Sequence, residues 1–364
     1  MWRDSPCMRD RRGFNDRKEN YLRPSTSASI CGSKSKIQNS MSYVLGIDGG
    51  GSKTVCILMD DTGKVLGRAE AGASNYQSIG TQAALKSIGS AISAAAVEAL
   101  KFTNNIKIEA ICLGLAGVGR PEDIEVVKSI VQNLQNSSLL PITWQLPASN
   151  IVICNDALIA LVGGVGYPVG IVVAAGTGSI VFGRNQNGDT KRVGGWGYIL
   201  GDEGSAYKIA VAGMQAALKA YDGREMSTSL VEEFKQHLDL TTIENLIEVI
   251  YRRGWGVKEI AALAPIVDNA AACGDKVAHI IIDDAVKELI KATSTVIEAI
   301  FSNSERFQVV TTGSVWQGKS RIREKFATSI FTLFPSAKVI FPRHEPAYGA
   351  GLLALQRLAG EEEF

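Results

Sequence analysis

Two aspartates stand where apolar runs end in this 364-residue chain. Asp48 follows Tyr43–Ile47, and Asp156 follows Ile151–Cys154 with Asn155 between them. An acid at the carboxyl end of a parallel strand lies where open α/β sheets bind ligands. A carboxylate placed there can hold Mg²⁺ or accept a proton from an attacking hydroxyl. The alternative is that Asn155 or Asp156 only caps the helix that follows.

A glycine turn with hydroxyl side chains follows the first aspartate. Its residues are Gly49, Gly50, Gly51, Ser52, Lys53 and Thr54. Glycine adopts backbone conformations that other residues avoid, so such a turn can bring N–H groups close to a phosphate. A dinucleotide-binding fingerprint would need a helix after the glycines, but the apolar run Val55–Met59 favours a second strand. A P-loop is also excluded, because Ser52 shifts Lys53 by one position from the place of the P-loop lysine. The alternative is a plain glycine hairpin whose aspartate is solvated.

The second half of the chain repeats this theme. Apolar runs at 171–174 and 180–183 flank a turn that contains Gly176, Thr177 and Gly178. Two hairpins of this kind predict a duplicated domain in which each half offers one phosphate loop.

Two further glycine-rich segments are candidates for a site. Residues 193–206, VGGWGYILGDEGSA, hold five glycines together with Trp196 and Asp202. Loops of this richness usually serve function, and the alternative is a flexible surface loop. Gly313 and Ser314 follow a predicted strand, and a glycine at a strand-to-helix turn can admit a nucleotide base or its phosphates.

The elements that must position these residues follow from the apolar pattern. Short apolar runs predict further strands at 65–69, 108–115, 307–311 and 338–341. Helical spacing predicts helices at 79–101, from Pro121 onward, and at 157–162, 207–221, 230–237, 280–301 and 346–358, with 241–303 mostly helical. Strands that alternate with helices place the chain in the α/β class.

The composition is that of a globular protein, with 46% hydrophobic residues, 21% charged residues and a net charge of +1. This balance gives no indication of nucleic-acid or membrane binding. Residues 1–40 lack apolar periodicity and carry nine Lys and Arg against four Asp and Glu, so we expect a disordered extension before a fold that starts at Met41. The uncharged run 157–183 has the length of a membrane span, but seven glycines and Pro168 favour a buried helix, turn and strand.

The six cysteines include no CxxC pair and the three histidines are scattered, so a Cys/His metal site is not expected. Cys56, Cys112 and Cys154 lie within apolar runs, where a free cysteine behaves as a small hydrophobe. This usage predicts a reducing compartment, and we expect a cytoplasmic protein.

Two phosphate-type loops, two aspartates and a glycine–tryptophan loop suit phosphoryl transfer. The chain resembles the N-acetylglucosamine kinase family, within the BadF/BadG/BcrA/BcrD ATPases of the actin/hexokinase/Hsp70-like superfamily. The resemblance runs from about 44 to 358 and rests on GIDGGGSKT (46–54), SNY (74–76), ND (155–156), AGTGS (175–179), GGWGYILGDEGSA (194–206) and TGSVW (312–316), in this order. It implies two duplicated ribonuclease H-like domains with a central cleft. The N-terminal lobe would span 41–157 and the C-terminal lobe 158–364, with the final helix packed back on the first lobe.

The same resemblance implies roles for individual residues. ATP would be bound by Gly49, Gly50, Gly51, Ser52, Thr54, Gly176, Thr177, Gly178, Gly313 and Ser314. Asp48 would address Mg²⁺, and Asp156 would be the catalytic base on the 6-hydroxyl of the sugar. The sugar site would also include Asn75, Gly195, Trp196, Gly197 and Asp202. The expected partners are ATP and an amino sugar, N-acetylglucosamine first, without nucleic acid or membrane, and we expect a homodimer.

One position departs from the family pattern. The animal kinase has glutamate where Asp48 stands, whereas bacterial relatives carry aspartate, so the resemblance leaves the preference among amino sugars open. An alternative is an ATPase that activates a 2-hydroxyacyl dehydratase or a benzoyl reductase. Such activators hold an iron–sulfur cluster with cysteines across a dimer. Here no cysteine follows a glycine loop in an obvious ligand position, and Cys154 lies within its strand. A sugar-sensing repressor would add a helix-turn-helix, for which residues 1–40 lack periodic helices.

Overall fold

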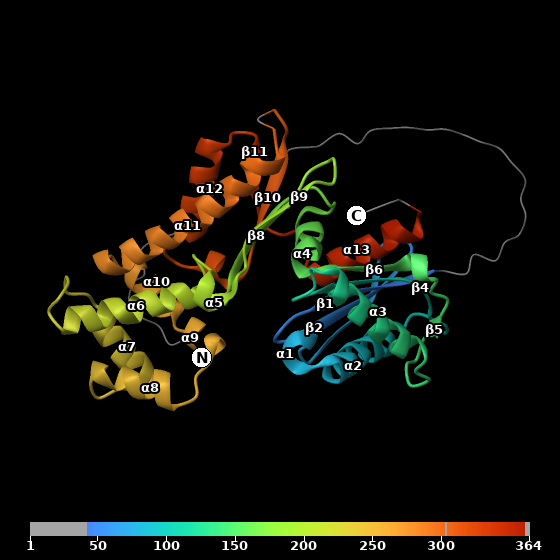
Figure 1. The fold of residues 1–364 in the computed structure, drawn as a ribbon, viewed down its shortest axis with the longest axis horizontal. Helices are drawn as coiled ribbons and strands as arrows, with labels where there is room; N and C mark the ends of the chain where they lie inside the picture. The colour runs from blue at the N-terminus through green and yellow to red at the C-terminus, as the bar shows by residue number, and fades with distance from the viewer. Residues whose placement is uncertain (1–41, 303, 361–364) are drawn as a thin grey trace, which may run out of the picture. The chain divides into compact units, whose positions relative to one another are not determined.

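The computed structural model describes residues 42–302 and 304–360, which form two sheets with helices packed on them (Figure 1). The predicted N-terminal extension at 1–40 and the fold start at Met41 lie outside the described residues.

The first sheet contains β1 Tyr43–Gly49, β2 Thr54–Asp60, β3 Val65–Ala71, β4 Lys107–Leu115, β5 Thr143–Trp144 and β6 Ile151–Asn155. Neighbours follow the order β3-β2-β1-β4-β5, and β6 also pairs with β4. Strands β1, β2 and β3 form an antiparallel meander, whereas β4 is parallel to β1 and β6 is parallel to β4. The carboxyl ends of β1 and β6, which carry Asp48 and Asn155, therefore lie at the same edge of the sheet.

The second sheet contains β7 Gly170–Ala175, β8 Ser179–Arg184, β9 Thr190–Gly194, β10 Phe307–Thr312 and β11 Ala337–Ile340. Neighbours follow the order β11-β10-β7-β8-β9. Here β7, β8 and β9 form the antiparallel meander, β10 is parallel to β7, and β11 is parallel to β10. The connectivity of the first sheet thus recurs, which confirms the predicted duplication.

The helices are α1 Tyr76–Ile79, α2 Thr81–Ala99, α3 Pro121–Gln135, α4 Asp156–Val165, α5 Gly197–Leu200, α6 Ala206–Tyr221, α7 Leu230–Leu238, α8 Leu246–Arg252, α9 Val257–Ala261, α10 Ala264–Ala272, α11 Lys276–Ile300, α12 Ile322–Leu333 and α13 Pro346–Leu358. Single 3₁₀ turns lie at Ala148–Asn150, Ile243–Asn245 and Ser314–Gln317. Among the described helices, none has both the length and the apolar character that crossing a membrane requires.

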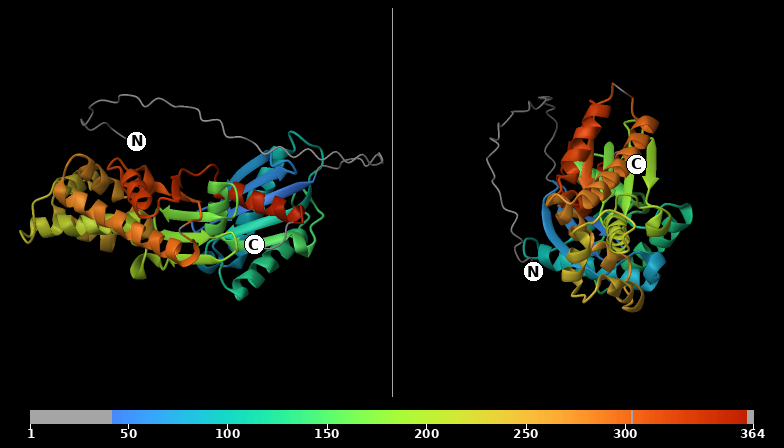
Figure 2. Two further views of the ribbon diagram at one scale, coloured as in Figure 1. Left: turned by 90° about the horizontal axis from the view of Figure 1, so that it is seen from above. Right: turned by 90° about the vertical axis from the view of Figure 1, so that its left-hand side faces the viewer.

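Both faces of the central strands of the first sheet are covered, which explains their continuous apolar runs. Leu45 and Ile47 pack in one cluster with α2, whereas Val44 packs in another with α13. Helix α13 contacts β1, β4 and α4, and Figure 2 shows it in red beside the blue strands. Gly46 permits this contact, because a Cβ there would lie 2.3 Å from the Ala347 carbonyl oxygen. The last helix therefore packs on the first strand.

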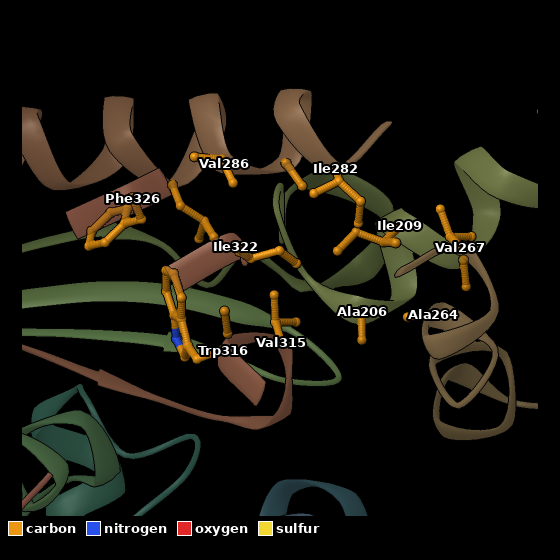
Figure 3. Packing of buried hydrophobic residues seen from close by; sticks show 14 of the residues in the cluster. Ala206, Ile209, Ala264, Val267, Ile282, Val286, Val315, Trp316, Ile322 and Phe326 are labelled. Carbon is orange, nitrogen blue, oxygen red and sulfur yellow. The ribbon is translucent and has the colours of Figure 1, made fainter. Parts of the chain in front are cut away.

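The core of the second half lies between its sheet and helices α6, α10, α11 and α12. Figure 3 shows Ile209, Ile282 and Phe326 in this cluster with Trp316. The Trp316 indole Nε1 donates a hydrogen bond of 3.1 Å to the Val173 carbonyl oxygen. This bond ties the segment that follows β10 to the centre of the sheet.

Two edge strands differ from the sequence prediction. Strand β5 has two residues, and the first three residues of β9 are exposed, so neither strand shows an apolar run. Two parts of the predicted loop 193–206 have regular structure. Val193 and Gly194 end strand β9, and residues 197–200 form the short helix α5.

Candidate active site

The turn between β1 and β2 is the first predicted phosphate loop. The Gly50 amide donates to the Lys53 carbonyl oxygen at 3.0 Å, and the Gly50 carbonyl oxygen accepts from the Ser74 amide at 3.0 Å. A Cβ on Gly49 would lie 2.3 Å from Ser74 Oγ, so glycine is required there. A Cβ on Gly51 would meet nothing within 4 Å. The base of the loop is therefore held in place, whereas its tip is accessible.

The two hydroxyl side chains of this loop have different surroundings. Ser52 is exposed at the tip. Thr54 is buried, and its Oγ1 donates to the Gly72 carbonyl oxygen at 2.7 Å. Thr54 therefore fixes the base of the loop, and a phosphate contact by its side chain would require this hydrogen bond to be exchanged.

Asp48, near the end of β1, lies among charged groups from other elements. The pKa of its carboxyl is raised to about 6, chiefly by burial. The negative charges of Asp156 and Glu345 also raise this pKa, whereas the positive charge of Lys53 lowers it. The structure thus brings the two predicted aspartates together. Glu345 was not singled out from the sequence, where its signal is only an acid before the proline of a small-residue helix. Its carboxylate pairs with Arg68 Nε at 2.7 Å.

A cation near Asp48 would relieve this repulsion between carboxylates. Mg²⁺ prefers oxygen ligands and usually binds one or two carboxylates together with phosphate oxygens and water. Within the part of the chain that the structure describes, no group of three or more His, Cys, Asp or Glu side chains could hold a metal ion. The carboxylate of Asp48 could supply one oxygen ligand to a Mg²⁺ ion, with nucleotide phosphates and water as the others.

Asn155 and Asp156 have separate tasks at the start of α4. Asn155 is the cap, because its Oδ1 accepts from the Ala157 amide at 2.9 Å, and its Nδ2 donates to the Val118 carbonyl oxygen at 3.0 Å. Asp156 is the first residue of α4, and its carboxylate lies against the same free amides at the start of the helix. Burial raises the pKa of Asp156, whereas the backbone amides of Ala157 and of Asp156 itself and the charge of Arg192 act to lower it.

The turn between β7 and β8 is the second predicted phosphate loop. The Gly176 amide donates to the Gly178 carbonyl oxygen at 2.9 Å, and the Gly176 carbonyl oxygen accepts from the Ala206 amide at 2.8 Å. Asp202, predicted for the sugar site, lies against this turn, since a Cβ on Gly178 would be 2.7 Å from Asp202 Oδ2. Burial raises the pKa of Asp202, and the Ser179 amide acts to lower it. The carboxylate of Asp202 therefore supports the second loop.

Gly313 and Ser314 lie beside this second loop. A Cβ on Gly176 would be 4.0 Å from both the Gly313 Cα and the Ser314 amide nitrogen. Gly313 has a φ of 107°, and a Cβ there would lie 2.3 Å from the Ala175 carbonyl oxygen, so the position requires glycine. Thr177 is exposed at the tip of the loop. The structure thus brings these predicted ATP-binding residues of the second half together.

Asn75 lies next to the first loop. Its Oδ1 accepts from the Gln77 amide at 3.1 Å, which caps α1, and its own amide donates to the first glycine loop at 3.2 Å. A Cβ on Gly117 would be 3.2 Å from Asn75 Oδ1. The next residue, Val118, accepts the side-chain hydrogen bond of Asn155. The segment after β4 thereby connects Asn75 to the start of α4.

Gly195, Trp196 and Gly197 follow β9. The Gly195 amide donates at 3.0 Å to the carbonyl oxygen of the first residue of β8, which places this turn next to the second loop. Trp196 is 69% exposed, and Gly197 has a φ of 85°. Arg192, which was not singled out from the sequence, has its guanidinium carbon 5.1 Å from the Trp196 ring centroid. Its position on an edge strand opposite Phe182 becomes apparent only from the strand pairing.

This duplicated architecture, with a glycine turn after the first strand of each half, is the fold of the actin/hexokinase class. The chain belongs to the BadF/BadG/BcrA/BcrD ATPase family, whose profile matches residues 45–354.

Curated relatives span nearly the whole described chain. An N-acetylmuramic acid/N-acetylglucosamine kinase of Clostridium acetobutylicum is 35% identical over 316 residues, which cover 86% of this chain and 98% of that protein. An N-acetyl-D-glucosamine kinase of Dictyostelium discoideum is 34% identical over 322 residues, which cover 85% of this chain and 97% of that protein.

Solved structures support the fold. A protein of Chromobacterium violaceum, provisionally assigned as an N-acetylglucosamine kinase, aligns with a TM-score of 0.64 at 23% identity over 86% of this chain and 98% of its own. A protein of Porphyromonas gingivalis with the same provisional assignment aligns with a TM-score of 0.59 at 21% identity over 88% of this chain and 100% of its own.

Proposed function

We propose that the protein is an ATP-dependent kinase that transfers the γ-phosphoryl group of ATP to the 6-hydroxyl of an amino sugar, with N-acetylglucosamine as the first candidate. The observation that carries this proposal is the strand register, which places Asp48 opposite Gly114 and Asn155 opposite Leu115, so that Asp48 and Asp156 flank the end of β4 at one sheet edge beside the first glycine loop. The two curated kinases at 35% and 34% identity support the amino-sugar class.

In this mechanism Asp156 would accept the proton of the attacking hydroxyl. Its raised pKa makes it a better proton acceptor than an ordinary aspartate once it is ionised. The exposed tips at Gly51 and Thr177 would offer backbone amides to the phosphates, and Asp48 would hold the metal. Bound Mg²⁺ neutralises charge on the transferring group. Catalysis would then rest mainly on positioning and charge neutralisation, as is typical of phosphoryl transfer.

The sugar would bind beside Asn75 and the turn that contains Gly195, Trp196 and Gly197. The exposed indole of Trp196 offers an apolar face, and Asn75 offers an amide near the start of α4. Asp202 would contribute indirectly, because its carboxylate lies against the second phosphate loop. This arrangement would place the sugar between Asp156 and the phosphates.

The test is a coupled ADP-release assay with wild type, Asp156→Asn and the control Asp222→Asn, which changes an exposed carboxyl on a surface ion pair. We expect Asp156→Asn to lower kcat by about 10²- to 10⁴-fold, with nucleotide binding retained. Product NMR would identify the phosphorylated oxygen. A rate for Asp156→Asn close to that of the control would refute the assignment of the base.

The activator alternative predicts sugar-independent ATP hydrolysis and a brown preparation that contains iron. Cys56 and Cys112 are buried in the first sheet, where they cannot reach a cluster shared between subunits. Iron analysis of the purified protein distinguishes the two functions.

The lobe boundary at 157/158, the homodimer and the cytoplasmic location also remain predictions. Light scattering coupled to gel filtration tests the homodimer.

A further inference from the structure

Arg192 makes contacts with three consecutive residues of the glycine–tryptophan turn. Its Nε donates to the Gly194 carbonyl oxygen at 3.2 Å, and its Nη2 donates to the Gly195 carbonyl oxygen. Its guanidinium carbon lies 5.1 Å from the centroid of the Trp196 ring. One side chain therefore contacts the whole segment at which the chain leaves β9.

The turn needs such a restraint because its backbone is unusual. Gly194 and Gly195 have φ values of 75° and 69°, a region that only glycine adopts readily. Glycine is also the most flexible residue, so two in succession leave the direction of Trp196 poorly defined. A further restraint comes from β8, because Ile180 pairs with Gly194 and the Gly195 amide donates at 3.0 Å to the Ser179 carbonyl oxygen. The turn is thus held by β8 and by the side chain of Arg192.

The guanidinium is suited to this task. It is planar and presents its donors in a fixed fork, so it can bind two successive carbonyl oxygens, whereas a lysine ammonium is a point charge on a flexible chain. A cation over an indole face adds attraction.

Arg192 is also electrostatically connected to the candidate base. Ile180, which lies opposite Gly194, packs against the cluster that contains Ala157, the residue after Asp156, and the charge of Arg192 acts to lower the pKa of Asp156. The other charged groups near this site are Asp48 on β1, whose pKa responds to the charge of Asp156, and Lys53 and Glu345, whose charges also act on Asp48. Among these charges Arg192 is the one that also contacts the predicted sugar-binding turn.

We propose that Arg192 is a positioning residue that holds the 194–196 turn, and with it Trp196, in a fixed relation to Asp156. This inference rests on the proposed function, because it assigns the turn to the sugar side of the site. The proposal predicts that loss of the guanidinium weakens sugar binding and leaves ATP binding largely unchanged.

The experiment compares Arg192→Met, Arg192→Lys and the control Lys191→Met, an exposed neighbour on the same strand. For Arg192→Met we expect the KM for sugar to rise at least about tenfold and kcat to fall by up to about a hundredfold, because small misplacements near the reacting atoms have effects of that size. The KM for ATP should stay within about twofold, and Arg192→Lys should recover only part of the loss because it restores the charge without the fork.

A second readout does not depend on catalysis. Arg192→Met should change the emission of Trp196 and its quenching by acrylamide, and the change should disappear in a Trp196→Phe background. Kinetics of Arg192→Met that match Lys191→Met, or equal rises in both KM values with a lowered melting temperature, would overturn the proposal. If the wild-type protein phosphorylates no sugar, the proposed function fails, and an unchanged Trp196 signal would then separately overturn the contact role of Arg192.

Discussion

Replacing Asp48 by asparagine should stabilise the protein at neutral pH while abolishing its activity. The pKa of this carboxyl rises from 3.8 to about 6, chiefly because burial disfavours the charged form and because Asp156 and Glu345 repel it. Between those two pH values the folded state binds a proton that the unfolded state has released. The free energy of unfolding therefore falls as pH rises from about 4 to about 6, and the loss remains at higher pH.

The size of the effect follows from the shift. A difference of about 2 pH units at about 1.4 kcal/mol per unit corresponds to about 3 kcal/mol at pH 8. The same relation leaves about half of that penalty at pH 5. Asparagine keeps the shape of the side chain and removes the charge. Asp48→Asn should thus raise the free energy of unfolding by up to about 3 kcal/mol at pH 8 and by about half as much at pH 5.

Urea unfolding followed by circular dichroism, without nucleotide or Mg²⁺, measures this difference at several pH values. Asp61→Asn is the control, because Asp61 is exposed in the turn after β2. Two results would refute the reasoning: a variant no more stable than wild type at pH 8, or an advantage that is the same at pH 5 and pH 8. Added Mg²⁺–ATP should stabilise wild type more than Asp48→Asn, because a ligand stabilises the state that binds it.

Two further substitutions test how the site is positioned. Gly349→Ala should lower the melting temperature, because its Cβ would lie 2.1 Å from the Ile159 carbonyl oxygen, and such overpacking costs about 1–3 kcal/mol or more. Gly119→Ala is its control, since a Cβ there meets nothing within 4 Å, and equal melting of the two variants would contradict the close contact. Asn155→Ala should destabilise by about 1–2 kcal/mol in urea unfolding, because it removes the cap of α4 and the bond to Val118. Asn133→Ala on the exposed face of α3 is its control, and an equal effect would argue against the cap.

The sequence predicts best the elements that carry an apolar run. Strands β1, β2, β7 and β10 and helix α13 are placed within two residues of their observed ends, because continuous apolar runs or small-residue spacing mark them. Edge strand β9 is not predicted, because its first three residues are polar and exposed and form no apolar run. Arg192 lies on that strand, so its contacts with the 194–196 turn could not be predicted before the strand was known.

In the candidate site, too, local sequence pattern predicts some residues and cannot predict others. The local pattern predicts Gly49, Gly176 and Gly313. A Cβ on Gly49 would clash with the Ser74 side chain and one on Gly313 with the Ala175 backbone, whereas a Cβ on Gly176 would have room. Glu345 could not be found in this way, because its relation to Asp48 depends on packing between segments almost 300 residues apart.

That packing explains how two aspartates far apart in the sequence are held at one edge of the first sheet. Helix α13 contacts both β1, which carries Asp48, and α4, which begins with Asp156. A Cβ on Gly46 would lie 2.3 Å from the Gly351 amide nitrogen, and a Cβ on Gly163 would lie 2.5 Å from the Glu345 carbonyl oxygen. At these positions the last helix thus meets the strand and the helix backbone to backbone. A displacement of α13 relative to β1 or α4 would break these close backbone contacts, so the small residues of 346–358 help to hold the two elements that carry Asp48 and Asp156.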